Sequence, residues 1–560
     1  MSSAALNGTS GLKDGAPVSL RSSDHDPTIK LFWILLTGHV LIWMAVCLLT
    51  QPNMPLDMVE MLFWGQQWQL GYHKHPPLPA WTAASAWWLS GGHPWSMYLV
   101  SQATIAVTFW AVWQFARESL SPRAALCSVV VLQACYYCTF LINDINNTIV
   151  TRPFWALAVL FLFRALAREK TAIRNLYWIL AGVAIGLGML CKYYMGVLVL
   201  AMIAVPVFVP AVRKELRTAG PWLTFGTALL IFLPHLLWMI DNDFITIRYV
   251  LDRSGEAPDS GSLVRHLTSP LNFLLSQLPA VIPVLLVATP LLMNRGAKRT
   301  VAPNNGNPNQ LFWKYLLIIF FGPVVIYVLL GAVTGATIRT MWGGPLFSFL
   351  GVFLFAAIPL PEDHSKVRKM IRDAIIIGLF MAVALVGRNV LGPKVRGEQS
   401  RVHFPGQSLS TLVQQRWNEH YTNPLPIVGG ELFLAGCVGV YNENAVDVYG
   451  DMSVIASPWT DDRDLSSRGG IVVWDQNENG ELPPPAWMQR FASVEILDPV
   501  VCRSQSVTDD VEVRVGVALV HPTSPGGLAF AVNRIGNTPI SADSPERIAS
   551  EPGSTSPIVR

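Results

Sequence analysis

Residues 31–50 read LFWILLTGHVLIWMAVCLLT, and residues 55–81 read PLDMVEMLFWGQQWQLGYHKHPPLPAW. The first stretch is apolar over a length that crosses a lipid bilayer. The second stretch begins with two carboxylates, Asp57 and Glu60, whose spacing puts both on one face of an expected helix. Charge beside a spanning segment costs free energy, so such residues are functional candidates by default. Together the two stretches predict an integral-membrane enzyme with its catalytic mouth directly after the first span.

The composition supports a membrane protein. Of 560 residues, 51% are hydrophobic and only 14% are charged, whereas soluble domains carry about a quarter of charged residues. The formal net charge of +3 gives no indication of a nucleic-acid partner. The 20 Trp fit a protein with many membrane interfaces, where indole rings settle at headgroup depth.

Apolar runs of spanning length recur through the first 390 or so residues. They predict a mainly α, polytopic chain with about eleven transmembrane helices. The expected spans are 31–50, 93–115, 124–142, 150–167, 175–191, 194–212, 221–240, 271–293, 311–332, 343–360 and 371–391. A shorter apolar stretch at 79–92 extends the second span or lies in the interface.

The basic residues sort by side of the membrane. One set of loops holds Arg117 and Arg123; Arg168, Lys170 and Arg174; Arg213, Lys214 and Arg217; Arg295, Lys298 and Arg299; and Lys366, Arg368, Lys369 and Arg372. By the positive-inside rule these loops are cytoplasmic. The other set is 51–78, 143–149, 241–270 and 333–342. With an odd number of spans, the N-terminus lies inside and the tail from 392 outside, in the periplasm of a bacterial inner membrane.

The chain divides into four segments. Residues 1–30 are polar, lack a signal-peptide pattern and are expected to be a disordered cytoplasmic terminus, and 31–391 form the transmembrane domain. Residues 392–536 predict a small soluble α/β domain, because strand-like runs at 426–429, 471–475, 493–498 and 511–520 alternate with helical stretches near 407–418 and 485–491. Residues 537–560 are rich in Ser, Pro, Glu and Gly, which predicts disorder. Whether Cys437 and Cys502 pair in this domain is open.

Asp57 is the first candidate for chemistry. A carboxylate here can accept a proton from an acceptor group as a general base. With Glu60 it can also hold a divalent cation through oxygen ligands. The alternative is that these carboxylates only favour the positive end of a helix dipole after Pro55, which explains one of them more easily than two.

His73, Lys74 and His75 form a cationic or titratable cluster before Pro76 and Pro77. Lysine binds phosphate as a point charge, and histidine adds a hydrogen bond or a proton. The cluster therefore predicts a phosphate-binding element. A polar turn ended by prolines is the alternative.

The second outer loop, FLINDINNTIVTRPFW, offers Asp144 and Asn147 as ligands for sugar hydroxyls. An N-cap for the helix that follows is an equally good explanation of the loop.

Several further candidates fall in loops or span ends of the expected outer face. They are Lys192 in LCKYYMG, His235 in LPHLLW, Asp243 and Arg248 in DNDFITIRYV, and Arg339 and Trp342 in TIRTMWGG. Lysine and arginine suit a phosphate group, and Arg forks onto its oxygens. A lysine that reaches to the membrane surface is the alternative for Lys192. We expect Lys74, His75, Lys192, Arg248 and Arg339 to bind a donor phosphate, and His73, Asp144, Asn147, His235, Asp243 and Trp342 to bind the rest of the substrates.

The order of motifs resembles the GT-C superfamily of glycosyltransferases. YHKHPPL, NNTIVTRPFWALAVLFLFRAL, MLCKYYMG, LPHLLWMIDNDF and MWGGPLF follow the acidic loop in sequence. They resemble the dolichyl-phosphate-mannose protein mannosyltransferases and lipid A aminoarabinose transferases, and in detail a subset that includes the rhizobial lipopolysaccharide galacturonosyltransferases. The resemblance covers about residues 30–390.

The resemblance implies a polyprenyl-phosphate-linked sugar donor and transfer on the periplasmic side to a lipopolysaccharide, lipid A, other glycolipid or protein acceptor. Asp57 matches the family's catalytic acidic position. Glu60 stands near the second acidic position, which in the family directly follows the first. The aminoarabinose transferases carry a lysine before the Pro-Pro pair, where this chain has His75, with Lys74 one residue earlier. Asn147 matches an amide of the subset.

We therefore predict an inverting glycosyltransferase. The alternative is a multispan transporter or flippase for a lipid or solute, which would also carry charge among many spans. Transporters place their sites at the midplane and often show internal repeats. This chain shows no repeat, and its polar residues gather at one face.

Overall fold

The computed structural model describes residues 26–169, 171–255, 263–292, 308–358, 360, 364–396, 400–491, 493–505 and 512–523. The expected disordered segments, apart from residues 26–30, and the basic residues Lys170, Arg295, Lys298 and Arg299 lie outside this range.

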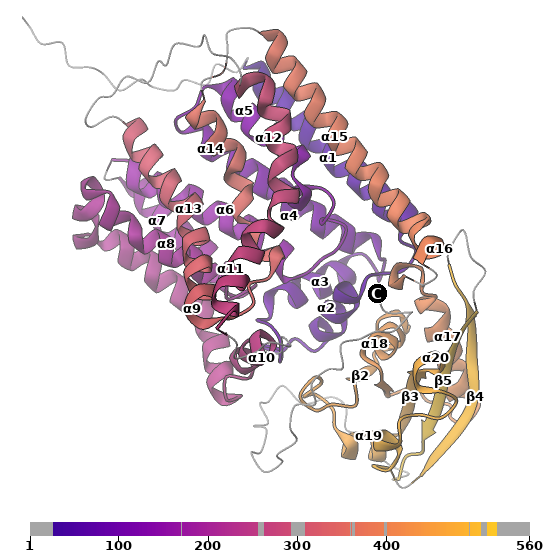
Figure 1. Ribbon diagram of the computed structural model, residues 1–560. Helices are drawn as coiled ribbons and strands as arrows, with labels where there is room; N and C mark the ends of the chain where they lie inside the picture. Colours follow the sequence, from indigo (N-terminus) through magenta and orange to yellow (C-terminus); the bar gives the residue numbers. More distant parts are fainter. Residues whose placement is uncertain are drawn as a thin grey trace, which may run out of the picture.

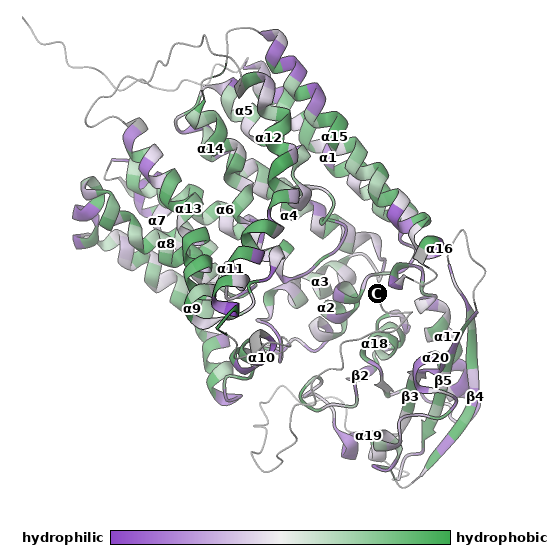
Figure 2. Ribbon diagram, viewed as in Figure 1, coloured by the Kyte–Doolittle hydropathy of each residue, from purple (hydrophilic) through white to green (hydrophobic). Residues whose placement is uncertain are grey.

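A bundle of apolar helices makes up most of the molecule (Figure 1). Within the described residues, nine helices are long and apolar enough to cross a membrane. Seven are single helices: α1 (Pro27–Thr50), α4 (Trp95–Arg117), α6 (Asn147–Ala167), α7 (Ala172–Met189), α9 (Ala219–Asp241), α13 (Pro308–Thr334) and α15 (His364–Val390). Two are composite: α11 (Arg265–Ser276) with α12 (Leu278–Leu292), and η4 (Thr340–Gly343) with η5 (Leu346–Phe349) and α14 (Leu350–Ala357). Figure 2 shows hydrophobic residues along the length of these helices and hydrophilic ones toward their ends.

The other two expected spans also have helical counterparts, but irregular ones. The run 194–212 forms α8 (Met195–Phe208) and η3 (Pro210–Arg217), which meet at an angle of 109°. Proline at 210 prevents the helix from continuing straight. The run 124–142 forms α5 (Pro122–Val130), η1 (Val131–Ala134) and η2 (Tyr136–Cys138), because Cys135 adopts an extended conformation that stops the helix. The predicted mainly α polytopic fold is confirmed, with nine regular spans among the described residues, or ten if the bent pair counts as one, where about eleven were expected.

The loop after the first span folds into two short helices, α2 (Leu56–Gln66) and α3 (Leu78–Leu89), which pack against each other. They lie at the end of the bundle that also holds α10 (Ile245–Gly255) and the C-terminal region (Figure 1). Two short elements, α16 (Gly392–Arg396) and η6 (Arg401–His403), lead from α15 into that region.

The C-terminal region is a small α/β unit, as predicted. Its sheet has the order β2-β1-β3-β5-β4, in which β1 pairs in parallel with β2 and β3, and β5 pairs antiparallel with β3 and β4. The strands are β1 (Ile427–Gly430), β2 (Asp447–Gly450), β3 (Gly470–Asp475), β4 (Val494–Arg503) and β5 (Glu512–Val520). The helices are α17 (Gly406–Asn418), α18 (Leu432–Tyr441), α19 (Asp462–Arg468), α20 (Gln476–Asn479) and α21 (Pro485–Met488). Strand β2 is absent from the sequence-based expectation. Cys437 and Cys502 are both buried free thiols, so the structure holds no bridge between them.

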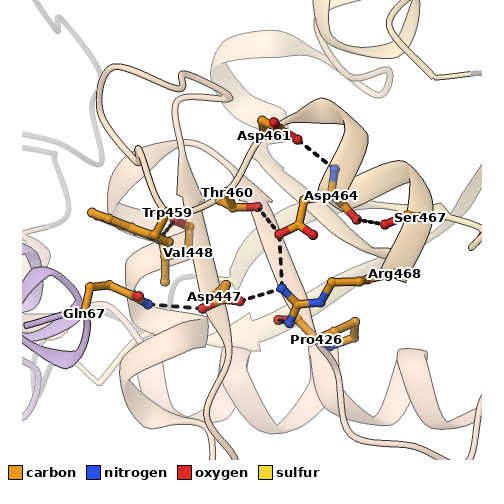
Figure 3. A network of polar contacts seen from close by, with 10 residues as sticks. All are labelled: Gln67, Pro426, Asp447, Val448, Trp459, Thr460, Asp461, Asp464, Ser467 and Arg468. Carbon is orange, nitrogen blue, oxygen red and sulfur yellow. Dashed lines mark hydrogen bonds and ion pairs between the residues drawn. The ribbon is translucent and has the colours of Figure 1, made fainter. Parts of the chain in front are cut away.

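One hydrophobic core joins α2 and α3 to the C-terminal sheet. Helix α18 lies on α2, and Gly436 makes this approach possible: a Cβ there would stand 2.7 Å from Val59 Cγ1. A polar network adds to the contact at the end of α2 (Figure 3). Gln67 Nε2 donates to Asp447 Oδ1 at 3.1 Å, and Arg468 donates to the other oxygen of Asp447 at 2.7 Å. The helix that carries the two carboxylates is therefore fixed from the C-terminal side.

Candidate active site

Helix α2 presents Asp57 in its first turn. Pro55 precedes the helix in an extended conformation, and a carboxylate near this end favours the dipole. The apolar side chains of α2, among them Met58, Val59 and Phe63, are buried in the core shared with the C-terminal region. Burial of that face leaves the Asp57 carboxylate partly exposed, at the end of the bundle.

Glu60 is paired, not free. Its carboxylate is buried, and Oε1 accepts a hydrogen bond from Lys74 Nζ at 3.0 Å. Burial raises the pKa of Glu60, and Lys74 opposes that shift. The loop from 67 to 77 thus folds back so that its lysine neutralises the second carboxylate of α2.

His73 and His75 lie beside aromatic rings. Both imidazoles are within 6.4 Å of the Trp64 ring, and Tyr249 of α10 stands 6.0 and 6.3 Å from them. Burial, followed by the charge of neighbouring lysines, holds the pKa of each well below its usual value. Both rings are therefore neutral near pH 7.

Lys192 reaches the same end of the bundle from the turn between α7 and α8. Its Nζ donates to Thr148 Oγ1 at 2.9 Å, and the Tyr194 hydroxyl donates to the Thr148 carbonyl at 3.2 Å. Asn146 caps α6 by accepting from the amides of Thr148 and Ile149. The N-cap predicted as an alternative for this loop is present, and the same helix end also fixes the lysine.

Charges converge on Asp57. Burial raises its pKa. Three cations from distant parts of the chain oppose this shift, in the order Lys192, Lys74 and Arg401, and the Asn146 side chain also favours the ionised carboxylate. Burial raises the pKa of Asp144 well above its usual value, and the charge of Asp57 adds to that shift. Of the two carboxyl groups, Asp144 therefore has its pKa raised further and holds a proton more readily than Asp57.

Lys192 belongs to a second group of cations at the edge of the site. Burial lowers its pKa to about 8; Asp57 opposes the shift, and Arg339 and Arg253 add to it. Both arginine side chains are exposed. Arg339 lies in the turn before η4, and Arg253 lies on α10. Three positive charges within mutual influence, two of them accessible, form a site suited to a phosphate group.

Other predicted residues hold the surroundings of the site in place. His235 is buried; its Nδ1 donates to the Leu70 carbonyl at 2.7 Å, and its Nε2 accepts from the Tyr193 hydroxyl at 2.7 Å. Asn147 is buried in the first turn of α6, and its Oδ1 has no hydrogen-bond partner among the described residues. Trp342 is half-buried, with its ring 5.7 Å from Tyr327.

Asp243 and Arg248 lie apart from this cluster. They pair with each other at 3.6 Å, with side chains 74% and 56% exposed. Neither is among the groups that act on Asp57 or Lys192. Of the two arginines expected to stabilise the phosphate, the structure brings Arg339 to the cluster.

Three residues of the cluster were not among the predicted site residues. Asn146 stands next to Asn147, which was selected. The sequence does not tell which of the two lies near the carboxylates, because helix caps and ligands use the same residue types. Arg253 lies one helical turn and a half beyond Arg248 on α10, so the choice between them required the helix orientation. Arg401 lies after the last span, where hydropathy carries no information about contacts.

The residues do not fit a resident divalent cation. Lys74 is bonded to Glu60 Oε1, and its positive charge opposes a divalent cation at that carboxylate. Among the described residues, no group of three His, Cys, Asp or Glu side chains is arranged to hold a metal ion.

Comparisons with known proteins show what the chain as a whole is similar to. Residues 74–238 match the family described as dolichyl-phosphate-mannose-protein mannosyltransferase. The lipopolysaccharide core galacturonosyltransferase RgtB of Rhizobium johnstonii is 23% identical over 82% of this chain and 91% of its own length. RgtA of the same organism, also a lipopolysaccharide core galacturonosyltransferase, is 22% identical over 83% of this chain and 91% of its own.

A solved structure shares the fold. The crystal structure of ArnT from Cupriavidus metallidurans bound to undecaprenyl phosphate aligns with a TM-score of 0.55 over 88% of this chain and 98% of that one, at 14% identity. The resemblance to the GT-C superfamily predicted from the sequence is confirmed, as are the multi-span membrane character and the glycosyltransferase class.

Proposed function

We propose that this chain transfers a sugar from a polyprenyl-phosphate donor to a lipopolysaccharide or related glycolipid, with Asp57 as the general base. One observation carries the proposal: Asp57, Lys74, Lys192, Arg339 and Arg253 come from five separate loops or helices and meet at one end of the bundle. A base beside a cation cluster is what transfer from a phosphate leaving group requires.

The proposed reaction is a single displacement. An acceptor hydroxyl oxygen attacks the anomeric carbon while the bond from that carbon to the phosphate oxygen breaks. The hydroxyl proton passes to Asp57, and the lipid phosphate leaves with the bonding electron pair. Lys192, Arg339 and Arg253 stabilise the negative charge that grows on the phosphate. Displacement from the opposite face inverts the anomeric configuration.

The relatives suggest the substrates. RgtB and RgtA are named for galacturonosyl transfer to the lipopolysaccharide core, and the ArnT structure holds undecaprenyl phosphate. We propose an undecaprenyl-phosphate-linked or similar sugar as donor, with galacturonic acid as the first sugar to test. The exposed apolar side chains of the membrane helices offer a surface on which a prenyl chain can lie.

We propose that the site faces the periplasm. One end of the bundle holds the loops 51–78 and 143–149, the outer turns around Lys192 and Arg339, and the region from 392. The positive-inside rule assigns the opposite end, with its basic loops, to the cytoplasm. The division into a transmembrane domain of 31–391 and a periplasmic domain of 392–536 is part of this proposal.

The variant Asp57→Asn tests the proposal. Asparagine keeps the size of the side chain but cannot accept the proton, so transfer should fall by a factor of about 10² to 10⁴. The measurement is galacturonic acid transfer from the synthetic undecaprenyl-phosphate donor to purified lipopolysaccharide lacking that sugar. Asp498→Asn, an exposed carboxylate on β4, serves as the matched control with normal transfer expected. Normal turnover by well-folded Asp57→Asn protein would refute the role of Asp57, and no transfer by the unaltered protein with any prenyl-linked sugar would refute the function.

A further inference from the structure

Arg401 enters the site from outside the membrane bundle. It begins η6, the short turn that follows α15 and α16 and opens the C-terminal α/β region. Its backbone is fixed to the loop just before α2. Asn53 Nδ2 donates to the Arg401 carbonyl at 3.0 Å, and the Asn53 amide donates to the Val402 carbonyl at 2.9 Å. The two segments are thus joined next to the helix that carries Asp57.

Asn53 is itself held firmly. It is 2% exposed, and its Oδ1 accepts a hydrogen bond from the Tyr441 hydroxyl at 2.8 Å. Tyr441 ends α18, the helix that packs on α2. One asparagine therefore ties three segments together, and the position of the Arg401 backbone is determined by buried hydrogen bonds rather than by its own side chain.

The Arg401 side chain lies inside this junction. Its guanidinium stands 5.3 Å from the centre of the Phe433 ring, and its Nε is buried without a hydrogen-bond partner among the described residues. The group that acts on it most strongly is Asp57, with Glu60 also among its acidic neighbours. A buried donor without a partner costs free energy. An interaction with a nearby carboxylate would offset that cost.

We propose that Arg401 is a positioning residue of the active site, supplied by the C-terminal region, whose positive charge stabilises the Asp57 carboxylate for its role toward the acceptor. This inference rests on the proposed function and adds a residue to it. It makes the catalytic centre a product of two structural units: the bundle provides the base and the phosphate site, and the C-terminal region provides the cation that fixes the base.

The charges divide in a way that separates Arg401 from the phosphate site. The cations that act on Lys192 are Arg339 and Arg253. The groups that act on Arg401 are instead acidic: Asp57, Glu60 and Glu478, together with the Cys437 thiol. Asp57 is the group that acts on both Lys192 and Arg401. Arg401 therefore belongs to the base and not to the group of cations at the leaving group.

The test compares Arg401→Gln and Arg401→Lys with Arg416→Gln. Because Asn53 bonds only the backbone of residue 401, side-chain substitution leaves that junction intact. Arg416 pairs on the surface of α17 with Glu419 and is the matched control. The readouts are kcat/KM for sugar transfer against pH, the KM for the undecaprenyl-phosphate-linked donor, and the infrared carboxyl band that is lost in Asp57→Asn, which follows protonation of Asp57 without substrate.

In Arg401→Gln, the acid limb of the kcat/KM profile should shift toward higher pH. An opposite charge nearby favours the ionised carboxylate, so Arg401→Gln should move both the limb and the infrared midpoint up by about one pH unit. Lys74, Lys192, Glu60 and Asp144 also face Asp57 and remain in every variant. Arg401→Lys should recover part of the shift, the donor KM should stay unchanged, and Arg416→Gln should match the unaltered protein.

Three outcomes would overturn the inference. They are an unchanged infrared midpoint in Arg401→Gln, a loss of rate equal at every pH, and a raised donor KM with the acid limb in place, which would assign Arg401 to the phosphate. If the unaltered protein transferred no sugar while Arg401→Gln still moved the infrared midpoint, the inference would stand and the proposed function would fall.

Discussion

Lys192 is a residue of the candidate site whose charge changes with pH a little above neutrality. Burial lowers its pKa to about 8, so the side chain is positive below that pH and neutral above it. If the ammonium group binds the donor phosphate, kcat/KM should fall as the pH rises through about 8. Once a phosphate is bound, its negative charge raises the pKa of the lysine, and the alkaline limb of kcat should lie higher than that of kcat/KM.

The variant Lys192→Arg tests whether the alkaline limb reports loss of the charge of Lys192 or the titration of another group. Arginine stays protonated throughout this range, so the alkaline limb near pH 8 should disappear or move up by more than one unit. The rate below pH 8 should fall, because the longer guanidinium displaces the bond to Thr148. An alkaline limb at the same pH in both proteins would show that another group produces it.

Residue type and position single out Asp57 and Lys192 as candidates, because an ionisable side chain beside an apolar span has few reasons to be there. Their partners were harder to predict. The bond between Glu60 and Lys74 depends on how the loop 67–77 turns back, and the choice of Arg253 over Arg248 depends on which face of α10 meets the site. Arg401 could not be predicted from sequence, because a contact across more than 300 residues is fixed only by tertiary docking.

At the scale of elements, α2 is positioned by α18 as well as by its neighbours in the bundle. Gly436 on α18 has no side chain where Val59 and Phe63 of α2 approach; a Cβ would stand 2.7 and 3.2 Å from them. Valine and phenylalanine here are buried and cannot give way easily. The packing of two short helices therefore sets where Asp57 lies.

Gly436→Ala should displace α2 by a few tenths of an ångström or more and reduce transfer. Small displacements of reacting groups cost large factors in rate, so we expect a loss of about tenfold in kcat. Gly387→Ala on α15, where a Cβ meets nothing within 4 Å, is the matched control and should keep full activity. The measurement is transfer by both variants at equal folded protein, judged by gel filtration in detergent. Equal activity of Gly436→Ala and the control would show that α18 does not position the base.

The helices themselves were largely predictable, because each span is an uninterrupted apolar run. The exceptions have local causes: extended backbone at Cys135 shortens the run 124–142, and Pro210 bends the run 194–212. Strand β2 was missed because its sequence, DVYG, is four residues long and half-polar. A strand this short becomes a strand through its pairing with β1, which local sequence does not report.

At the scale of the whole molecule, the membrane bundle and the C-terminal region are joined by one hydrophobic core. Their shared core includes side chains from α2, α3, α17 and α18. Without the C-terminal region, the apolar outer face of α2 would therefore be exposed. Truncation after Arg396 would expose that face and remove Arg401, while the spans α1 to α15 would remain. The truncated protein should insert in the membrane and transfer no sugar.

Truncation after residue 536 is the matched control. The composition of 537–560 predicts a segment outside the folded domain, so its removal should leave transfer intact. Sugar transfer by membranes that contain each truncated chain at equal amounts is the measurement, with protease resistance of the bundle to confirm that it is folded. Because α2 depends on α18 for cover, loss of activity in the shorter chain with an intact bundle would show that the catalytic base is placed from outside the membrane. Transfer by the chain ending at Arg396 would instead mean that the bundle alone orients Asp57, and that Arg401 has no part in the reaction.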